Sequence, residues 1–463
     1  MITRTTISRA SGILIIVLLA ASCNTQKVPL QSVDTSGLYR DTTSTDTSTL
    51  ANTPWTQLFT DKQLQVLIRE GLENNFNLQV TMKKVEEAEA YFKQSRAQLL
   101  PSVSVVGNAS YSKNSKWLYP SGPLKAQYYA FGAEASWELD IWGKLSSAKR
   151  AAYANLLGSD AGRKAVQTRL ISDIASGYFN LLSLDAKLDI TRQTVKTSIE
   201  LVETMKALKE NGAVNGAAVV QSEAARYAAE VTIPDLEQQA LEQENALSLL
   251  VGQKGGTIAR SKLDEQPQAP LMHTGVPSQL LENRPDVVES EYQVITAYET
   301  TRSARAYFYP SLTITASAGL ESVNLDKLFD PASVAASILG GLIQPIFNKR
   351  ANIARLKVAK LQQEEALLNF KSTLYNAGNE VQDALGSYQS ADSKLKLRTL
   401  ELDALVKSVE YTKQLLRYGT ANYIEVLNAQ QSLLSAQLGS VNDHLQQLNA
   451  VVSLYRALGG GWK

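Results

Sequence analysis

The chain has 463 residues, with 46 Lys or Arg and 45 Asp or Glu, so its net charge of +1 gives no reason to expect a nucleic-acid partner. Hydrophobic residues make up 44%, which is enough for a folded core. After residue 22, no stretch is long and apolar enough for a membrane-spanning helix.

The first 22 residues are typical of a secretory signal peptide. A basic start is followed by a short apolar core at residues 13–19 and by small residues directly before Cys23. Cys23 is the only cysteine, so it cannot form a disulfide within the chain. Small residues before a cysteine resemble the cleavage site of bacterial lipoproteins, although Ala20 stands where such sites prefer leucine. We expect residues 1–22 to be removed and Cys23 to be acylated. The alternative is an ordinary signal peptide with an incidental cysteine.

The remaining chain is a tether followed by a duplicated unit. Residues 23–54 are rich in Ser and Thr and are expected to form a polar tether. Beyond it, Arg96, Pro101 and Ser102 recur 209 positions later as Arg305, Pro310 and Ser311. Likewise, Lys206 and Gly212 recur 207 positions later as Lys413 and Gly419. We therefore predict a first repeat at 55–263, a Pro-rich linker at 264–284 and a second repeat at 285–463.

Four segments alternate between apolar and polar residues, which is typical of strands with one apolar face. They are residues 102–112, 127–140, 311–321 and, with a poorer pattern, 333–344. A half-buried sheet in a soluble protein would show the same alternation. Each segment is also long enough to cross a bilayer when tilted, so a membrane β-barrel is an equal alternative.

The faces of these strands follow from the alternation. In a barrel, the apolar positions would meet lipid and the polar positions would line the lumen. We expect lipid contact from Tyr129, Phe131, Trp137, Leu312 and Ile314. We expect a lumenal position for Ser104, Glu134 and Thr315.

Long helices are predicted for the rest of each repeat. Apolar residues recur every seven positions, at Leu181, Leu188, Val195 and Val202 and again at Leu395, Leu402, Val409 and Leu416. This spacing is typical of coiled-coil packing. We predict helical hairpins over 143–252 and 349–459 that turn at Gly212 and Gly419, with a kink at Pro234.

Four strands cannot cross a membrane alone. A sheet edge in lipid leaves backbone groups unpaired, so membrane strands must close into a barrel. Single-chain barrels begin at about eight strands. If these strands cross a bilayer, several copies of the chain must therefore share one barrel.

Several motifs along residues 55–462 resemble one known family. They are WTQLFTDKQLQVLIREGLENNFNL at 55–78, PSVSV at 101–105, WELDIWGKLSSAKRAA at 137–152, LLENRPDV at 280–287, ARAYFYPSLTI at 304–314, QPIFNKR at 344–350 and LYRALGGGW at 454–462. In this order, and within a duplicated chain, they resemble the TolC-type outer-membrane factors, especially the lipidated branch.

The resemblance implies both a fold and a function. The fold would be an α+β membrane protein in which a homotrimer forms a 12-stranded β-barrel, continued by an α-helical tube in the periplasm. The function would be that of an exit duct in the bacterial outer membrane. It would passively conduct substrates delivered by an inner-membrane efflux pump and a periplasmic adaptor, the membrane fusion protein.

The resemblance also implies an entrance at the hairpin tips. In the family, acidic residues just inside the tip lie near the periplasmic entrance and affect cation passage. Glu425 matches one such position, about two turns into the last helix, and Asn428 stands where a second acid often lies. Tyr423 flanks the site. The alternative is an ordinary solvated glutamate near a helix N-terminus.

No enzyme, cofactor or metal site is expected. The segment GQKGGT at 252–257 lacks the spacing of a phosphate-binding loop. The only histidines, His273 and His444, have no cysteine or second histidine nearby and are expected to be solvated. The competing function is a coiled-coil periplasmic adaptor or a structural lipoprotein without a channel. That function would explain Cys23 and the seven-residue spacing, but not the four strands in two copies.

Overall fold

The computed structural model describes residues 38, 49–117, 120–121, 125–266 and 277–463. The signal segment, Cys23, His273, most of the tether and half of the linker lie outside these residues. Two compact units are present. Of the described residues, those within 84–160 and 289–371 form one unit, and those within 34–83, 161–288 and 372–463 form the other. Each unit draws on both halves of the chain, so the division into two consecutive repeats stays a prediction.

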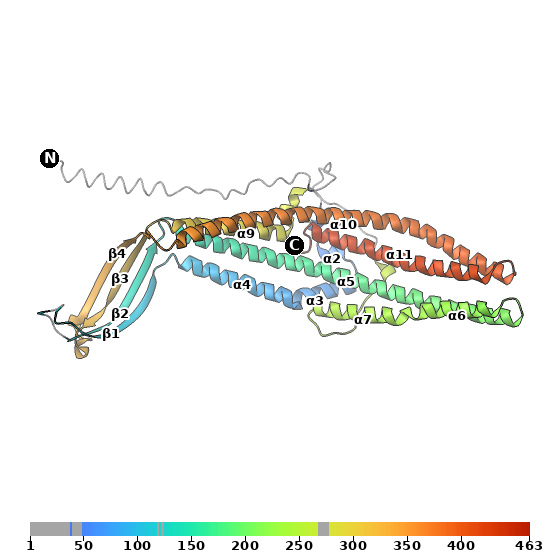
Figure 1. Cartoon of the computed structure of the whole chain (residues 1–463), viewed down its shortest axis with the longest axis horizontal. Coiled ribbons are helices and arrows are strands. Elements are labelled where there is room, and N and C mark those ends of the chain that lie inside the picture. The colour runs from blue at the N-terminus through green and yellow to red at the C-terminus, as the bar shows by residue number, and fades with distance from the viewer. Residues whose placement is uncertain (1–37, 39–48, 118–119, 122–124, 267–276) are drawn as a thin grey trace. The chain divides into compact units, whose positions relative to one another are not determined.

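The first unit contains an antiparallel sheet with the strand order β1-β2-β3-β4 (Figure 1). The strands are β1 (Ser102–Lys113), β2 (Lys125–Leu139), β3 (Ser311–Ser322) and β4 (Val334–Ile343). The β3–β4 connection contains the short 3₁₀ helices η4 (Leu325–Lys327) and η5 (Pro331–Ser333). The predicted fold of four strands with long helices is confirmed, and β4 is present despite its poor alternation.

Helices adjoin the sheet at the ends of its strands. They are α4 (Phe76–Ala97), α9 (Pro285–Ala306) and the first parts of α5 (Lys144–Glu210) and α10 (Ala351–Arg417). Between β2 and α5, the Asp140 carboxylate accepts hydrogen bonds from the backbone N–H groups of Leu145 (2.8 Å) and Ser146 (2.7 Å). Such bonds satisfy amide groups that have no partner inside a helix, so Asp140 fixes the start of α5.

The second unit is helical. It contains η1 (Leu50–Asn52), α2 (Trp55–Leu58), α3 (Lys62–Asn74), α6 (Gly216–Glu230), α7 (Thr232–Leu250), η2 (Leu263–Glu265), η3 (Pro277–Gln279), α8 (Leu280–Asn283) and α11 (Tyr423–Ala457), together with most of α5 and α10. Leu181 and Val202, which belong to the seven-residue spacing, are fully buried, as coiled-coil packing predicts. No helix among the described residues is both long enough and apolar enough to cross a membrane.

An aromatic core holds the second unit together. The Phe59 ring lies 6.1 Å from the Tyr455 ring, edge to face, and 6.4 Å from the Phe179 ring. The Tyr455 hydroxyl donates to the carbonyl oxygen of Thr53 at 2.8 Å. These contacts join α5 and the last helix, α11, to the first described segments of the chain.

The predicted kink at Pro234 is a break between two helices. Helix α6 ends at Glu230 and α7 begins at Thr232. Pro234 lies in the first turn of α7, where the N–H that proline lacks would have no partner inside the helix. The proline therefore starts a new helix instead of bending an existing one.

Candidate functional site

The strand register gathers apolar side chains of all four strands on one face. Residues directly opposite each other share a face, and one such row is Val105, Ala133, Ala318 and Ala336. The larger apolar members of this face are Val103, Val105, Tyr111, Tyr129, Phe131, Trp137, Leu139, Leu312, Ile314, Leu320, Val334, Ile338 and Leu342. The structure therefore brings together all five residues that the sequence predicts to meet lipid.

The opposite face is mostly polar. One of its rows is Ser104, Glu134, Ser317 and Ser337, in which the hydroxyls of Ser317 and Ser337 lie 2.8 Å apart. Thr315 belongs to the same face, so the three residues predicted to line the lumen lie together. Gly132 and Gly319 are also opposite each other on this face. A Cβ at either glycine would lie 2.6 Å from a backbone oxygen of the other strand, so only glycine fits there.

The two helical hairpins turn in the same way. Gly212, between α5 and α6, and Gly419, between α10 and α11, both have φ +72°. At each turn, the glycine and the next residue donate backbone hydrogen bonds to the preceding helix, which is the Schellman ending of a helix. Asn215 and Asn422 then accept hydrogen bonds from the first turns of α6 and α11.

The acidic residue at the second tip lies closer to the turn than the sequence predicts. Glu425 is in the first turn of α11, not two turns into it. Glu425 and Asn428 are both exposed and lie one turn apart, so they share a face of α11. The counterpart of Glu425 in the first hairpin, Ala218, is fully buried. Only the second hairpin therefore presents an acid at this level.

Tyr423 belongs to an apolar cluster that joins the two tips. The ring packs against a buried group formed by Leu201, Met205, Ala218, Val219 and Val426. These residues come from α5, α6 and α11, so the contact lies within one copy of the chain. Tyr423 therefore fixes α11 against the first hairpin and leaves the exposed side of α11 to Glu425 and Asn428.

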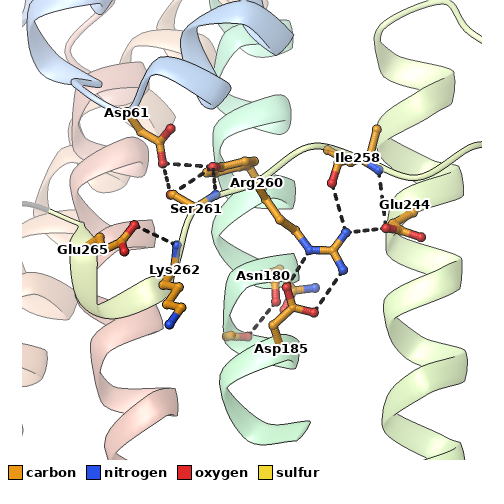
Figure 2. Close-up of polar contacts among 11 residues, drawn as sticks. Asp61, Asn180, Asp185, Glu244, Ile258, Arg260, Ser261, Lys262 and Glu265 are labelled. Atoms are coloured by element: carbon orange, nitrogen blue, oxygen red, sulfur yellow. Dashed lines mark hydrogen bonds and ion pairs between the residues drawn. The ribbon is translucent and has the colours of Figure 1, made fainter. Parts of the chain in front are cut away.

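A polar network, which the sequence analysis does not predict, fixes the segment after α7 (Figure 2). One Asp61 oxygen caps α3, and the other accepts hydrogen bonds from Tyr178 and Gln266, both at 2.9 Å, and from Ser261. Burial alone would raise the pKa of Asp61, but the bonds from Ser261, Gln266 and Tyr178 lower it below its usual value. Burial raises the pKa of Tyr178 to about 12.

Arg260 extends this network on the other side of the segment. Its guanidinium binds both oxygens of Asp185 and one oxygen of Glu244, which places α5 and α7 on either side of it (Figure 2). All these charged groups have partners within the network. We interpret the network as a structural clasp that holds residues 258–262 against the helices.

Arg284 forms a second clasp, in the segment that carries the LLENRPDV motif. Its side chain is only 8% exposed and forms ion pairs with Asp286 (2.6 Å) and Glu380 (2.7 Å). It also donates to the carbonyl oxygen of Ala457 at 3.0 Å. Arg284 therefore joins the start of α9 to α10 and to the end of α11.

The expectation of a solvated His444 is wrong. The side chain is partly buried in α11, and burial lowers its pKa. The neighbouring Asp443 is buried and accepts a hydrogen bond from Arg398 at 3.0 Å. The sequence suggests a charged face because two polar residues adjoin, but Asp443 is buried against Arg398 of α10 and His444 is half-buried.

Comparisons with known proteins agree with this geometry. The family model described as "Outer membrane efflux protein" matches residues 67–253 and 276–460. "Cation efflux system protein CusC" of Escherichia coli O6:H1 is 30% identical over 414 residues, covering 89% of either chain. "Probable outer membrane lipoprotein SilC" of Salmonella typhimurium is 31% identical, covering 89% of this chain and 88% of SilC. The open-state MtrE outer-membrane channel of Neisseria gonorrhoeae has a TM-score of 0.83 at 26% identity, covering 92% of this chain and 95% of MtrE.

Proposed function

Since the chain belongs to the outer membrane efflux protein family and is an outer-membrane exit duct, we propose that three copies of it assemble into one channel. The observation that carries the assembly is the four-stranded sheet, which has one apolar face and two unpaired edges among the described residues. Four strands cannot close in lipid, whereas three copies supply twelve.

Exposed apolar stripes on the helices support the same assembly. Helix α10 exposes Leu397 and Tyr411, and Tyr418, directly after its end, is exposed as well; α6 and α7 expose Val220, Tyr227 and Leu241. Within each stripe the residues lie seven or fourteen positions apart, which is the spacing of a coiled-coil seam. We propose that these stripes pack between neighbouring copies in the periplasm.

The partners in this proposal are those of a tripartite efflux system. An inner-membrane pump would supply the energy and select the cargo, and a periplasmic adaptor would connect the pump to the hairpin tips. The chain itself would conduct passively and catalyse no reaction. The alternative of an adaptor or a structural lipoprotein is not supported, because the family model and the solved relatives are outer-membrane channels.

We also propose that the mature chain begins at an acylated Cys23. The name of SilC as a probable lipoprotein supports this anchor. The variant Cys23→Ser should lose acyl labelling and remain as a precursor or be cleaved elsewhere. Assembly should persist, because a barrel anchors a protein far more strongly than lipid chains do. Metabolic labelling with a radioactive fatty acid, followed by purification, measures this. Label retained on the serine variant would show that the anchor lies elsewhere.

In this proposal, Glu425 lies at the periplasmic entrance of the channel. Threefold symmetry would bring three copies of this exposed carboxylate around one axis, where their fields attract cations and hinder anions. The wild-type chain, purified from outer membranes in mild detergent, is expected to be a trimer that prefers cations in planar-bilayer recordings. The variant Glu425→Gln should form the same trimer with a lower cation preference.

The matched control for this experiment is Glu410→Gln, which changes an exposed glutamate on α10 and should leave selectivity unchanged. The experiment distinguishes failure of the proposed assembly from failure of the proposed role of Glu425. A monomeric wild-type protein would contradict the assembly. Unchanged selectivity in a trimer of Glu425→Gln would return Glu425 to an ordinary residue near a helix N-terminus.

A further inference from the structure

The two edge strands of the sheet present apolar side chains that no other described residue covers. Ile338 and Leu342 on β4 are 83% and 69% exposed, and Val103 and Val105 on β1 are 70% and 71% exposed. Exposed edges of this kind pair with other strands. β1 follows α4 and leads away from the helices, whereas β4 leads back to α10. When two copies join edge to edge, β4 of one copy therefore runs antiparallel to β1 of the next.

The faces of the sheet restrict how these edges can align. One row of opposite residues runs through Ser102, Ser136, Thr315 and Leu339. In a closed barrel, the row continues onto β1 of the next copy, at a residue shifted along the strand. The shift must be even, because an odd shift would turn the apolar face of the next copy toward the lumen.

The tilt of the strands leaves two possible shifts. Measured perpendicular to the strands, twelve strands spaced about 4.8 Å apart make a circuit of roughly 58 Å. Along a strand, each residue adds about 3.3 Å. The barrel has three junctions between copies, and each junction contributes the same shift. Shifts of two, four, six or eight residues per junction then tilt the strands from the barrel axis by roughly 19°, 35°, 46° and 54°. Membrane barrels have tilts of about 35–45°, so only shifts of four and six fit. The direction is fixed, since a shift the other way would carry Leu339 past the start of β1.

Side chains separate the two remaining registers on the lumenal face. A shift of four places Leu339 opposite Val106, so that two aliphatic residues on an otherwise mostly polar face cover each other. It also places Ser337 opposite Asn108. A shift of six places Leu339 opposite Asn108 instead, which pairs an aliphatic side chain with an amide.

The outer face favours the same register. With a shift of four, Val105 lies opposite Gly340, where a Cβ would meet no described atom within 4 Å, and Ile338 lies opposite Gly107. With a shift of six, the two glycines face each other and Val334 faces Lys113. We propose that, in the trimer proposed above, β4 of each copy pairs with β1 of the next with Leu339 opposite Val106.

Disulfide trapping between copies tests this register. Two double variants of the full chain place cysteines at opposite positions for a shift of four, Val106→Cys with Leu339→Cys and Ser104→Cys with Gly341→Cys. Two matched variants do the same for a shift of six, Asn108→Cys with Leu339→Cys and Val106→Cys with Gly341→Cys. The five positions used, 104, 106, 108, 339 and 341, all lie on the lumenal face, so the variants leave the lipid-facing surface unchanged.

Outer membranes carrying each variant are oxidised mildly and analysed on non-reducing gels. We expect covalent dimers and trimers from the first two variants, at least tenfold more than from the second two. The reason is that residues displaced by two positions lie about 7–8 Å apart, beyond the reach of a disulfide.

An amine-reactive cross-linker, applied to the same membranes, reports assembly independently. Trimers in which only the second two variants form disulfides would overturn the register. Trimers in which none of the four forms a disulfide would overturn the pairing of β4 with β1. Monomers in every cross-linked sample, including the wild type, would overturn both the trimer and the register. The cross-linker is needed for this result, because absent disulfides alone would not separate a wrong register from a missing trimer.

Discussion

Replacing Ile314 by arginine is expected to abolish the trimer, whereas replacing the adjacent Thr315 by arginine should leave it intact. Ile314 lies on the apolar face of β3, opposite Trp137 of β2, and Thr315 lies on the other face, opposite Ser136. A charge that faces lipid near the middle of the membrane costs about 2–4 kcal/mol, and three copies would each bear that cost. A charge that faces a water-filled lumen avoids it.

The two variants form a matched pair, because they place the same side chain on neighbouring residues of one strand. Trimer yield in the outer-membrane fraction, measured by cross-linking and by mass in mild detergent, gives the result. Equal trimer yields for the two variants would contradict the assignment of the apolar face to lipid. Loss of the trimer in Thr315→Arg alone would reverse the two faces.

Elements with a strong local pattern could be predicted from the sequence. The alternation from Tyr129 to Trp137 defines both the strand and its apolar face, because side chains of a strand alternate with period two. Gly212 and Gly419 mark the hairpin turns, because a helix that ends in a left-handed residue favours glycine there. β4 is harder to predict because Leu339 and Ile343 stand on its polar face, and only pairing with β3 reveals the register.

The clasps could not be predicted, because their members are far apart in the chain. Tyr178 lies 117 residues from Asp61, and Ser261 lies 200 residues from it. Any of these side chains alone would be interpreted as a surface polar group. The motif around Arg284 is visible in the sequence, but Glu380, the partner of Arg284, is 96 residues away. The family resemblance points to Glu425, and the structure adds that Glu425 is exposed beside a buried cluster.

Replacing Arg284 by glutamine is expected to destabilise the second unit by about 3 kcal/mol. The Arg284 side chain is 8% exposed, and removal of its guanidinium leaves Asp286 and Glu380 without their common cation. Breaking a buried ion pair typically costs about 3–5 kcal/mol. The lower end applies because the two carboxylates are themselves 39% and 42% exposed. Thermal unfolding of the purified protein, followed by circular dichroism at neutral pH, measures the loss.

The matched control is Lys396→Gln, which removes an ion pair with Asp392 from the exposed surface of α10. A surface pair four residues apart on a helix contributes only about 0.3–0.5 kcal/mol, so this variant should unfold almost as the wild type does. The double variant Arg284→Gln with Glu380→Gln should recover part of the loss, because one of the two unpaired charges is gone. A double variant no more stable than the single one would mean that lost packing, and not charge, explains the effect.

The dependence on pH separates these causes further. Burial would raise the pKa of Asp286, but the hydrogen bond and the charge of Arg284 lower it below its usual value. A carboxylate whose pKa is lower in the folded state stabilises the fold above its unfolded pKa, and this contribution disappears as the pH falls through the folded pKa. The wild type should therefore lose stability below about pH 4, and Arg284→Gln should lose less, because its Asp286 has no cation to hold the pKa down. The gap between the two proteins should narrow with acid. A gap of constant size from pH 7 to pH 3 would show that Arg284 acts through its volume and its bond to Ala457 alone.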